Sequence, residues 1–407
     1  MIKRESYLSR IRPFIDKCEL IKVIVGVRRS GKSVMLELIA DELLQNNIRK
    51  EQLVFINFED MSFSKLCTAD ALHEYLKEKI SAIKGRAYIF LDEIQEVRNW
   101  EKCLNSLRVS SDADIYITGS NAKMLSGEYA TLLSGRYVEF TVYPFSFSEY
   151  CEARRAANDN RPAAELFTEY VKFGGLPFLA SAQFDERSKM QYLKDIYASV
   201  VIKDIVKRNM LRDVDLLERI IAYVAANIGR TFSANSIASY FKSERRSVAV
   251  DTVINYLNSC EKAFLFYKIR RMDLEGKEML QINEKYYLAD HGLRQATYGN
   301  NQRDIELILE NIVCLELLRL GYKVAIGKNG TKEIDFVCDR DGDRIYVQVC
   351  YYLSSEKTVE REFKAYENIK DNFPKYVISM DEFNMSRNGI IHMNIRDFLL
   401  TFQKDSK

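Results

Sequence analysis

The sequence predicts an α/β protein that begins with a parallel sheet, continues through helices and ends in a second α/β part. Two observations lead to this fold class. Apolar runs of strand length alternate with amphipathic helical stretches from Ile21 to Tyr150, as is typical of a parallel sheet covered by helices. The last hundred residues again mix strand and helix patterns, without an internal repeat. A chain of 407 residues is therefore expected to form two or three domains.

The first domain is expected over residues 1–150. Its first strand is Ile21–Val25, and the octapeptide GVRRSGKS separates this strand from a helical stretch at Val34–Leu44. Four further apolar runs of strand length follow, namely Leu53–Phe58, Ala87–Leu91, Asp114–Thr118 and Tyr137–Val142.

The octapeptide has the composition of a loop that binds phosphate. Glycines at both of its ends allow successive N–H groups to point at one spot, and the following helix N-terminus adds its positive dipole end. In this pattern Lys32 reaches the β and γ phosphates of a nucleotide, and the Ser33 hydroxyl holds Mg²⁺. We therefore expect ATP and Mg²⁺ as cofactors, with the nucleotide bound by Gly26, Val27, Arg28, Arg29, Ser30, Gly31, Lys32, Ser33 and Val34.

Two carboxylates follow the apolar run Ala87–Leu91. Asp92 is expected to coordinate Mg²⁺ through water, and Glu93 is placed to polarise an attacking water molecule. Acidic pairs after strands also open helices, and the octapeptide pattern occurs in unrelated loops. The octapeptide and the acidic pair occur in this order, and each directly follows an apolar run of strand length. Together they predict a nucleotide site far more specifically than either feature alone.

Composition and charge narrow the class of protein. No apolar run approaches the roughly 20 residues that span a bilayer, and the start of the chain lacks the apolar stretch of a secretory signal, so we expect a cytoplasmic protein without membrane contact. The net charge is +2, so any DNA binding must come from a local patch. Eight scattered cysteines and three distant histidines suggest no zinc site.

The middle of the chain is expected to be helical. A polar, alanine-rich segment at residues 153–164 places a boundary near residue 150. Residues 151–212 are interpreted as a helical lid or linker, with GGLP at residues 174–177 and a long helix over residues 186–209. Residues 213–299 contain three short helical pieces and then an alternating strand pattern, which together are typical of a winged helix.

Two interpretations of this winged helix are open. Such modules bind DNA in many proteins, and basic side chains that could contact phosphates lie near the expected turn and wing. The same module also packs as an internal scaffold, and solvated arginines at turns need no ligand. The basic residues in question are Lys242, Arg245, Arg246, Arg270 and Arg271.

The motifs GVRRSGKS, FLDEIQ, TGSNAKML, LLSGR and YPFSFSEY, in this order, make the first 150 residues resemble an AAA-type P-loop ATPase of prokaryotes. FGGLP, KYYLADHGL, LENIVCLELLRLGY and EIDFV extend the likeness over nearly the whole chain. The resemblance implies that Asn121 senses the γ phosphate and that Arg136 is an arginine finger or sensor, supplied within the chain or by a neighbouring subunit. Alternatively, Arg136 caps a helix or pairs with a surface carboxylate.

The segment 300–407 resembles the restriction-nuclease-like fold. It shows a helix at residues 305–320, strands at 323–326, 333–338 and 345–351, a helix at 359–369 and a strand at 376–379. Active members hold Mg²⁺ with an aspartate and a Glu-x-Lys or Gln-x-Lys element. The counterparts here are Glu310, Asp335, Gln348 and Cys350, in which a thiol replaces the lysine, and Lys357 is a conceivable substitute. We therefore expect a degenerate site, and a structural role or a protein partner for this domain.

Together these features predict an ATP hydrolase that uses Mg²⁺ and whose nucleotide state repositions its C-terminal domains. The alternative is a slow ATP-gated switch or a binding module for protein or nucleic acid. A third interpretation couples the ATPase to DNA cleavage. The sequence leaves a homo-oligomer open.

Overall fold

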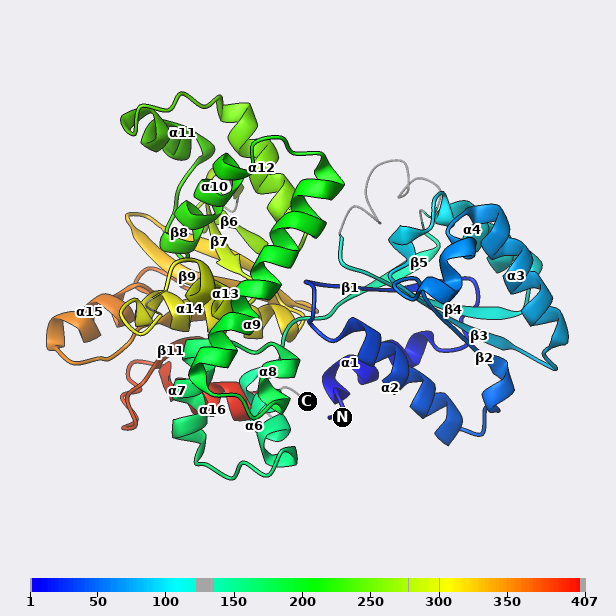
Figure 1. The fold of residues 1–407 in the computed structure, drawn as a ribbon. Coiled ribbons are helices and arrows are strands. Elements are labelled where there is room, and N and C mark those ends of the chain that lie inside the picture. Colours follow the sequence, from blue (N-terminus) through cyan, green and yellow to red (C-terminus); the bar gives the residue numbers. More distant parts are fainter. Residues whose placement is uncertain (1, 122–132, 134, 277, 300, 403–407) are drawn as a thin grey trace. The chain divides into compact units, whose positions relative to one another are not determined.

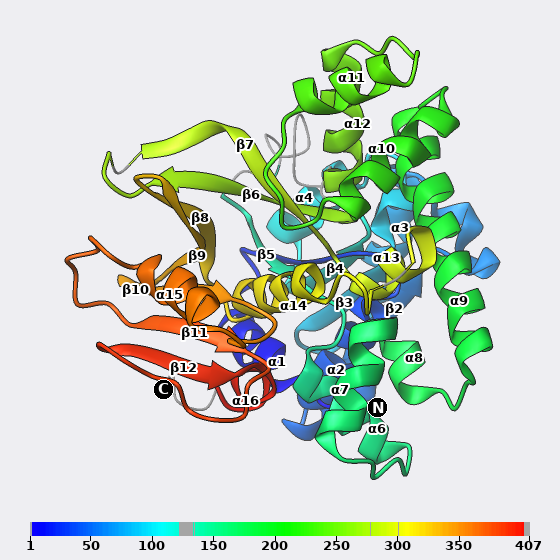
Figure 2. The same ribbon diagram turned by 90° about the vertical axis from the view of Figure 1, so that its left-hand side faces the viewer.

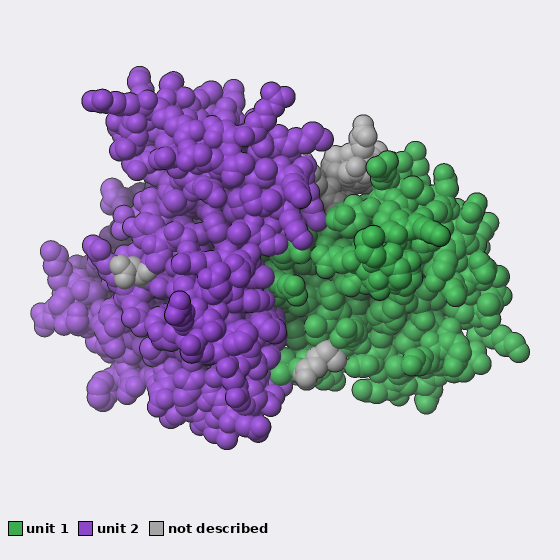
Figure 3. Space-filling model, in the orientation of Figure 1, with its two compact units in different colours: residues 1–143, 262–264 green, residues 144–261, 265–407 purple. Residues whose placement is uncertain are grey.

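A computed structural model describes residues 2–121, 133, 135–276, 278–299 and 301–402, and all structural statements concern these residues. The chain divides into two units, residues 1–143 with 262–264 and residues 144–261 with 265–407 (Figure 3). The first unit thus ends at Tyr143, a few residues before the boundary that the sequence predicted.

A five-stranded parallel sheet organises the first unit, in the order β2-β3-β4-β1-β5. The strands are β1 Ile21–Val25, β2 Leu53–Asn57, β3 Ala87–Asp92, β4 Ala113–Gly119 and β5 Tyr137–Thr141. Each predicted strand of this unit is present, within one residue at either end. The predicted parallel sheet is therefore confirmed.

Helices cover both faces of this sheet, with α1 and α2 on one side and α3 and α4 on the other (Figure 1). Their bounds are α1 Glu5–Ile11, α2 Lys32–Gln45, α3 Ala69–Ala82 and α4 Trp100–Ser110, with short 3₁₀ turns at Arg12–Phe14, Lys50–Gln52, Met61–Leu66 and Ile94–Glu96. Strands β1, β3 and β4 are buried along their whole length. Burial on both faces explains why the sequence of these strands is almost continuously apolar.

The strand order positions the predicted site. Strand β4 lies between β1 and β3, and the register pairs Val25 with Gly119 and Leu91 with Ile117. Because the three strands are parallel, their carboxyl ends meet at one edge of the sheet. The phosphate loop after β1 and the carboxylates after β3 therefore share this edge.

The second unit contains a seven-stranded mixed sheet in the order β12-β11-β10-β9-β8-β6-β7. Its strands are β6 Phe266–Asp273, β7 Glu278–Leu288, β8 Lys323–Asn329, β9 Lys332–Arg340, β10 Asp343–Val349, β11 Lys375–Ser379 and β12 Ile390–Asn394. None of the helices in the described ranges has the length and apolar character needed to cross a bilayer.

The segment expected to be a lid is helical and belongs to this second unit. It forms α6 Phe147–Ala156, α7 Ala163–Phe173, α8 Pro177–Ser181 and α9 Glu186–Ser199, and α9 continues into wide π-helical turns at Val200–Lys207. The later helices are α10 Val214–Ala226, α11 Ala234–Ser243, α12 Val250–Lys262, α13 His291–Thr297, α14 Ile305–Arg319, α15 Glu356–Lys364 and α16 Ile395–Thr401.

The hairpin that follows the three short helices α10, α11 and α12 is part of the large sheet. Strand β6 pairs with β7 on one side and, in parallel, with β8 on the other, where Arg271 lies opposite Ile326 (Figure 2). Pairing satisfies the main-chain groups that a free strand edge would leave open. The sheet therefore continues across residue 300, where the sequence predicted the boundary between domains 213–299 and 300–407.

Candidate active site

The phosphate loop joins the end of β1 to the start of α2, which confirms the predicted strand-loop-helix context. Gly26 has a φ of 149°, and a Cβ atom there would lie 2.2 Å from the main-chain oxygen of Val142. Only glycine fits so close an approach. Gly31, with a φ of 99°, precedes the first turn of α2, and its oxygen accepts a hydrogen bond from Met35 N–H at 3.0 Å.

Lys32 folds back over the loop. Its side chain is buried, and its Nζ donates to the main-chain oxygen of Val27 at 3.2 Å. Ser33, the next residue, is exposed in the first turn of α2. The amine and the hydroxyl predicted to meet phosphate and Mg²⁺ thus both lie at the start of this helix, where its dipole favours negative charge.

Thr118, near the end of β4, holds both predicted carboxylate residues. Its hydroxyl donates a hydrogen bond to Asp92 and accepts one from the Glu93 N–H at 2.9 Å. The backbone of Glu93 adopts the left-handed conformation, with φ 55° and ψ 46°. Residues other than glycine rarely adopt this conformation outside functional sites and turns. Gln95 Nε2 donates to the Glu93 carboxylate and fixes its direction.

Sequence reasoning missed Thr118 and Gln95. Thr118 was identified only as the end of an apolar run, and what brings it to Asp92 is the pairing of β3 with β4. The polar residue at the end of a buried strand was the available signal.

Asn121 lies just beyond the carboxyl end of β4, at the same edge as the phosphate loop. Its side chain is 5% exposed, and its neighbour Ser120 is fully buried. The rest of the motif TGSNAKML, residues 122–125, lies outside the described residues.

Arg136 lies at the opposite edge of the sheet. It directly precedes β5, its main-chain oxygen accepts from Ile21 N–H at 2.9 Å, and its Nη1 donates to Asn105 Oδ1 of α4 at 3.0 Å. Ile21 is the first residue of β1, whereas Gly26 follows the last, so about 16 Å of strand separates the two edges. Arg136 is therefore remote from the phosphate loop of its own chain.

The residues at the loop edge suit Mg²⁺. In the described ranges, no group of three His, Cys, Asp or Glu side chains forms an all-protein metal site. Mg²⁺ commonly uses one or two protein oxygens and takes its other ligands from water and substrate phosphates. The Asp92 carboxylate and the exposed Ser33 hydroxyl supply this type of oxygen donor.

A second group of predicted residues meets in the second unit, around a lysine that sequence reasoning missed. Lys285 Nζ of β7 lies 2.9 Å from Glu310 Oε1 of α14, 2.9 Å from Glu333 Oε1 and 3.6 Å from Asp335 Oδ1. The main-chain N–H of Asp335 donates to Gln348 Oε1 at 3.2 Å. Glu310, Asp335 and Gln348 are therefore neighbours, and their assignment to a degenerate nuclease-like site stays a prediction.

This carboxylate cluster does not fit Mg²⁺. The ammonium of Lys285 already contacts three carboxylates, Tyr287 OH donates to Glu310 at 2.6 Å, and Asp335 Oδ2 accepts from Val349 N–H at 2.9 Å. An internal cation thus already occupies the place between these acidic side chains and offsets part of their negative charge.

The pKa values of the cluster follow from this arrangement. Burial lowers the pKa of Lys285, but the surrounding carboxylates, Glu310 first, more than offset this effect and raise its pKa above the ordinary value. Burial, and next the charge of Glu310, raises the pKa of Asp335 to about 8. Lys285 is therefore held charged, and Asp335 binds a proton tightly.

Cys350 and Lys357 lie apart from this contact set. Cys350 belongs to an apolar cluster with Val337 and Phe363, and burial raises the pKa of its thiol, so it is an apolar core residue. Lys357 lines a cavity of about 510 Å³ together with Asp335 and Gln348.

The basic residues of the expected winged helix are partly neutralised. Arg246 pairs with Asp213 at 2.7 Å and with Asp215, and Arg271 lies 3.8 Å from Glu333. Lys242, Arg245 and Arg270 are exposed.

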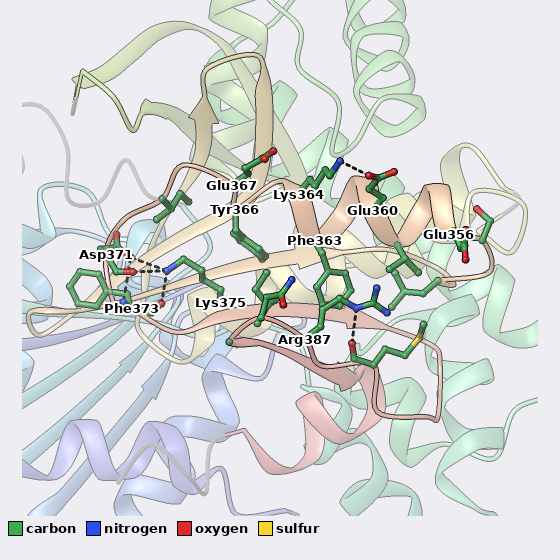
Figure 4. Close-up of a pocket in the computed structure, with 18 of the residues that line it drawn as sticks. Glu356, Glu360, Phe363, Lys364, Tyr366, Glu367, Asp371, Phe373, Lys375 and Arg387 are labelled. Carbon is green, nitrogen blue, oxygen red and sulfur yellow. Dashed lines mark hydrogen bonds and ion pairs between the residues drawn. The ribbon is translucent and has the colours of Figure 1, made fainter.

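A groove of about 1200 Å³ runs beside α15 in the second unit. Figure 4 shows Phe363 and Tyr366 lining it, with the Arg387 guanidinium 4.8 Å from the centre of the Phe363 ring. None of the predicted site residues lines this groove.

Comparisons with known proteins agree with the architecture of the first unit. Residues 19–151 match the family described as AAA domain, and residues 164–304 match a domain of unknown function, DUF8612. The chain is 40% identical over 401 residues to an uncharacterized protein of Haemophilus influenzae, covering 98% of this chain and 99% of the relative. It is 32% identical over 366 residues to an uncharacterized protein of Methanocaldococcus jannaschii, covering 86% of this chain and 79% of the relative.

A solved structure is similar in fold. The Walker-type ATPase of Pyrococcus abyssi has a TM-score of 0.53 and 15% sequence identity, and the match covers 73% of this chain and 96% of that chain. At this level of identity the likeness concerns the fold.

Proposed function

The chain belongs to the same family as these Haemophilus influenzae and Methanocaldococcus jannaschii relatives, and its residues 19–151 match the AAA domain. We propose that it binds ATP with Mg²⁺ and hydrolyses ATP to ADP and phosphate. The observation that carries the proposal is the link between β4 and the two residues Asp92 and Glu93. A single hydroxyl, that of Thr118, joins the Asp92 side chain to the Glu93 main chain beside the phosphate loop.

Each residue of the site has a role that its position supports. The loop N–H groups and Lys32 bind phosphates, while Ser33 and Asp92 hold the metal. When bound, Mg²⁺ neutralises negative charge on the phosphates. Glu93 orients the attacking water, and Asn121 contacts the γ phosphate. The chemistry rests mainly on positioning and electrostatics.

Arg136 enters the proposal only as a residue of a second copy of the chain. Its position at the far edge of the sheet supports action on the nucleotide of a neighbouring subunit rather than on that of its own loop. In a homo-oligomer the same exposed side chain can meet the γ phosphate of a neighbouring subunit. Such an arginine stabilises the charge that develops in the transition state.

We further propose that the nucleotide state repositions the second unit. The rival is a switch that holds ATP and hydrolyses it slowly, with its second unit binding protein or nucleic acid. DNA contact through residues 213–299 and a protein partner for residues 300–407 remain predictions. DNA cleavage is not part of the proposal, because Lys285 already contacts the acidic side chains that would hold a metal.

Phosphate release with Mg²⁺ and ATP, measured across protein concentrations, tests the proposal. Lys32→Ala removes the phosphate contact and is the blank. Glu93→Gln keeps the shape of the side chain, so it should bind ATP and release no phosphate. Wild-type protein that binds ATP without measurable turnover would favour the switch.

A further inference from the structure

Arg4 is buried at the N-terminus, immediately before α1, and it contacts the phosphate loop. The side chain is 1% exposed, and its guanidinium carbon lies 4.4 Å from the centre of the Tyr7 ring. Its Nη1 donates to the main-chain oxygen of Ser30 at 3.0 Å, and its Nη2 donates to the main-chain oxygen of Tyr143 at 2.9 Å. One planar group thus joins two segments that are distant in sequence.

The contact with Ser30 orients the loop. In a planar trans peptide the oxygen and the N–H point in opposite directions, so fixing the Ser30 oxygen also fixes the Gly31 N–H. That N–H belongs to the set of loop donors that the sequence assigns to phosphate. A bidentate guanidinium can hold such a peptide in place, whereas a single ammonium cannot reproduce both bonds in the same geometry.

The second contact of Arg4 binds Tyr143, the residue at which the chain leaves the first unit. Val142 N–H donates to Val25 O at 2.7 Å, directly before the loop, and the Val142 oxygen occupies the space that a side chain on Gly26 would need. Tyr143 N–H donates to the Tyr7 hydroxyl at 3.2 Å. Both main-chain groups of Tyr143 are therefore held by the N-terminal segment.

The next residue is anchored within the second unit. Pro144 begins that unit, its ring fixes φ, and its oxygen accepts from Arg319 Nη2 of α14 at 3.2 Å. Consecutive carbonyls at the junction are thus bound by two buried arginines, Arg4 for Tyr143 and Arg319 for Pro144. The phosphate loop and this junction are therefore connected by a short series of hydrogen bonds.

We propose that Arg4 is a positioning residue that ties the phosphate loop to Tyr143, so that nucleotide bound at the loop is sensed where the chain enters the second unit. The inference rests on the proposed nucleotide site and adds the route by which this site acts on the junction. It requires nucleotide binding but not hydrolysis.

A non-hydrolysable ATP analogue with Mg²⁺ tests the inference by two readouts, its Kd and the exchange of main-chain amides at residues 142–143. In wild-type protein the analogue should slow this exchange. Arg4→Lys should bind the analogue about tenfold more weakly, the size expected for loss of one charge-assisted hydrogen bond. At saturating analogue it should still lack the protection at residues 142–143.

Two variants separate this role from a general loss of stability. Arg12→Ala removes another arginine next to α1, one that pairs with Glu5 and Glu42 and should leave both readouts unchanged. Tyr7→Phe keeps the ring beneath Arg4 but removes the acceptor of Tyr143 N–H, so it should bind the analogue normally and lose the protection.

The outcomes distinguish the role of Arg4 from the proposed nucleotide site. Arg4→Lys protein with wild-type protection would overturn the role of Arg4 while leaving the nucleotide site intact. Tyr7→Phe protein with wild-type protection would show that the hydrogen bond to the Tyr7 hydroxyl is not part of the route. A wild-type protein that fails to bind the analogue would overturn the proposed function, and the inference with it.

Discussion

The hydroxyl oxygen of Thr118 lies 2.9 Å from the main-chain nitrogen of Glu93 and accepts its hydrogen bond. The same hydroxyl donates to the carboxylate of Asp92. One side chain of β4 therefore orients the residue assigned to the metal and the residue assigned to the water. Glu93 has a left-handed backbone conformation, and Gln95 donates a hydrogen bond to its carboxylate.

Replacing Thr118 with valine should impair turnover. Valine has nearly the same shape but neither donor nor acceptor, and loss of a group that orients a metal ligand typically costs about 10–100-fold in activity or metal affinity. We expect Thr118→Val to release phosphate at least tenfold more slowly and to need more Mg²⁺, as measured in steady-state kinetics. Thr118→Ser keeps the hydroxyl and is the control. Wild-type kinetics in Thr118→Val would contradict the assigned geometry.

Arg136 should act between subunits. Arg136→Ala and Lys32→Ala are each expected to be inactive, but a mixture of the two should regain part of the activity. The loop of one variant can then be combined with the arginine of the other. Where an arginine finger has been measured, its loss costs about 10³- to 10⁵-fold in rate, so even partial recovery is detectable.

Asn105→Ala is the control for this experiment. It removes the partner of Arg136 within the same unit and should retain activity. If Asn105→Ala were as inactive as Arg136→Ala, and the mixture showed no recovery, Arg136 would be a structural residue.

The parts of the site that are local in sequence could be predicted. Gly26, Lys32 and Ser33 occur in one octapeptide between an apolar run and a helical pattern, and Asp92 with Glu93 directly follows another run. These patterns fix the loop and the strand ends regardless of strand order. The buried runs of a parallel sheet also define its strands to within a residue.

Contacts that depend on strand order were beyond prediction. Thr118 meets Asp92 because β4 pairs with β3, and Arg4 meets Ser30 through the packing of the N-terminal segment. Lys285 precedes the residues assigned to the C-terminal domain, and it joins Asp335 only because the sheet continues from β7 through β6 and β8 to β9. No local pattern specifies such pairings.

Lys285 should be essential for the stability of the second unit. Lys285→Met removes the cation between Glu310 and Glu333 and leaves buried negative charge, a change that typically costs about 3–5 kcal/mol. Urea unfolding followed by a probe in the second unit measures the loss. Chelation of divalent metal should leave wild-type stability unchanged.

The matched control for Lys285→Met is Lys332→Met. Lys332 pairs with Glu367 at the surface, where water and salt screen the interaction, so its removal should have little effect. Equal effects of the two substitutions, or destabilisation of the wild type by a chelator, would contradict the internal-cation interpretation.

Asp335 should give the second unit a pH-dependent stability. Its pKa rises from an ordinary value of 3.8 to about 8, first through burial and then through the charge of Glu310. Because the folded state binds the proton more tightly than the unfolded state, this contribution to stability is full below about pH 4 and is lost as the pH rises to about 8.

Asp335→Asn has no such proton, while its side-chain oxygen can still accept from Val349 N–H. Urea unfolding at several pH values should therefore show the wild-type free energy of unfolding falling relative to that of Asp335→Asn between about pH 4 and 8. A difference between the two proteins that is constant or rises with pH would show that Asp335 is ionised in the folded protein.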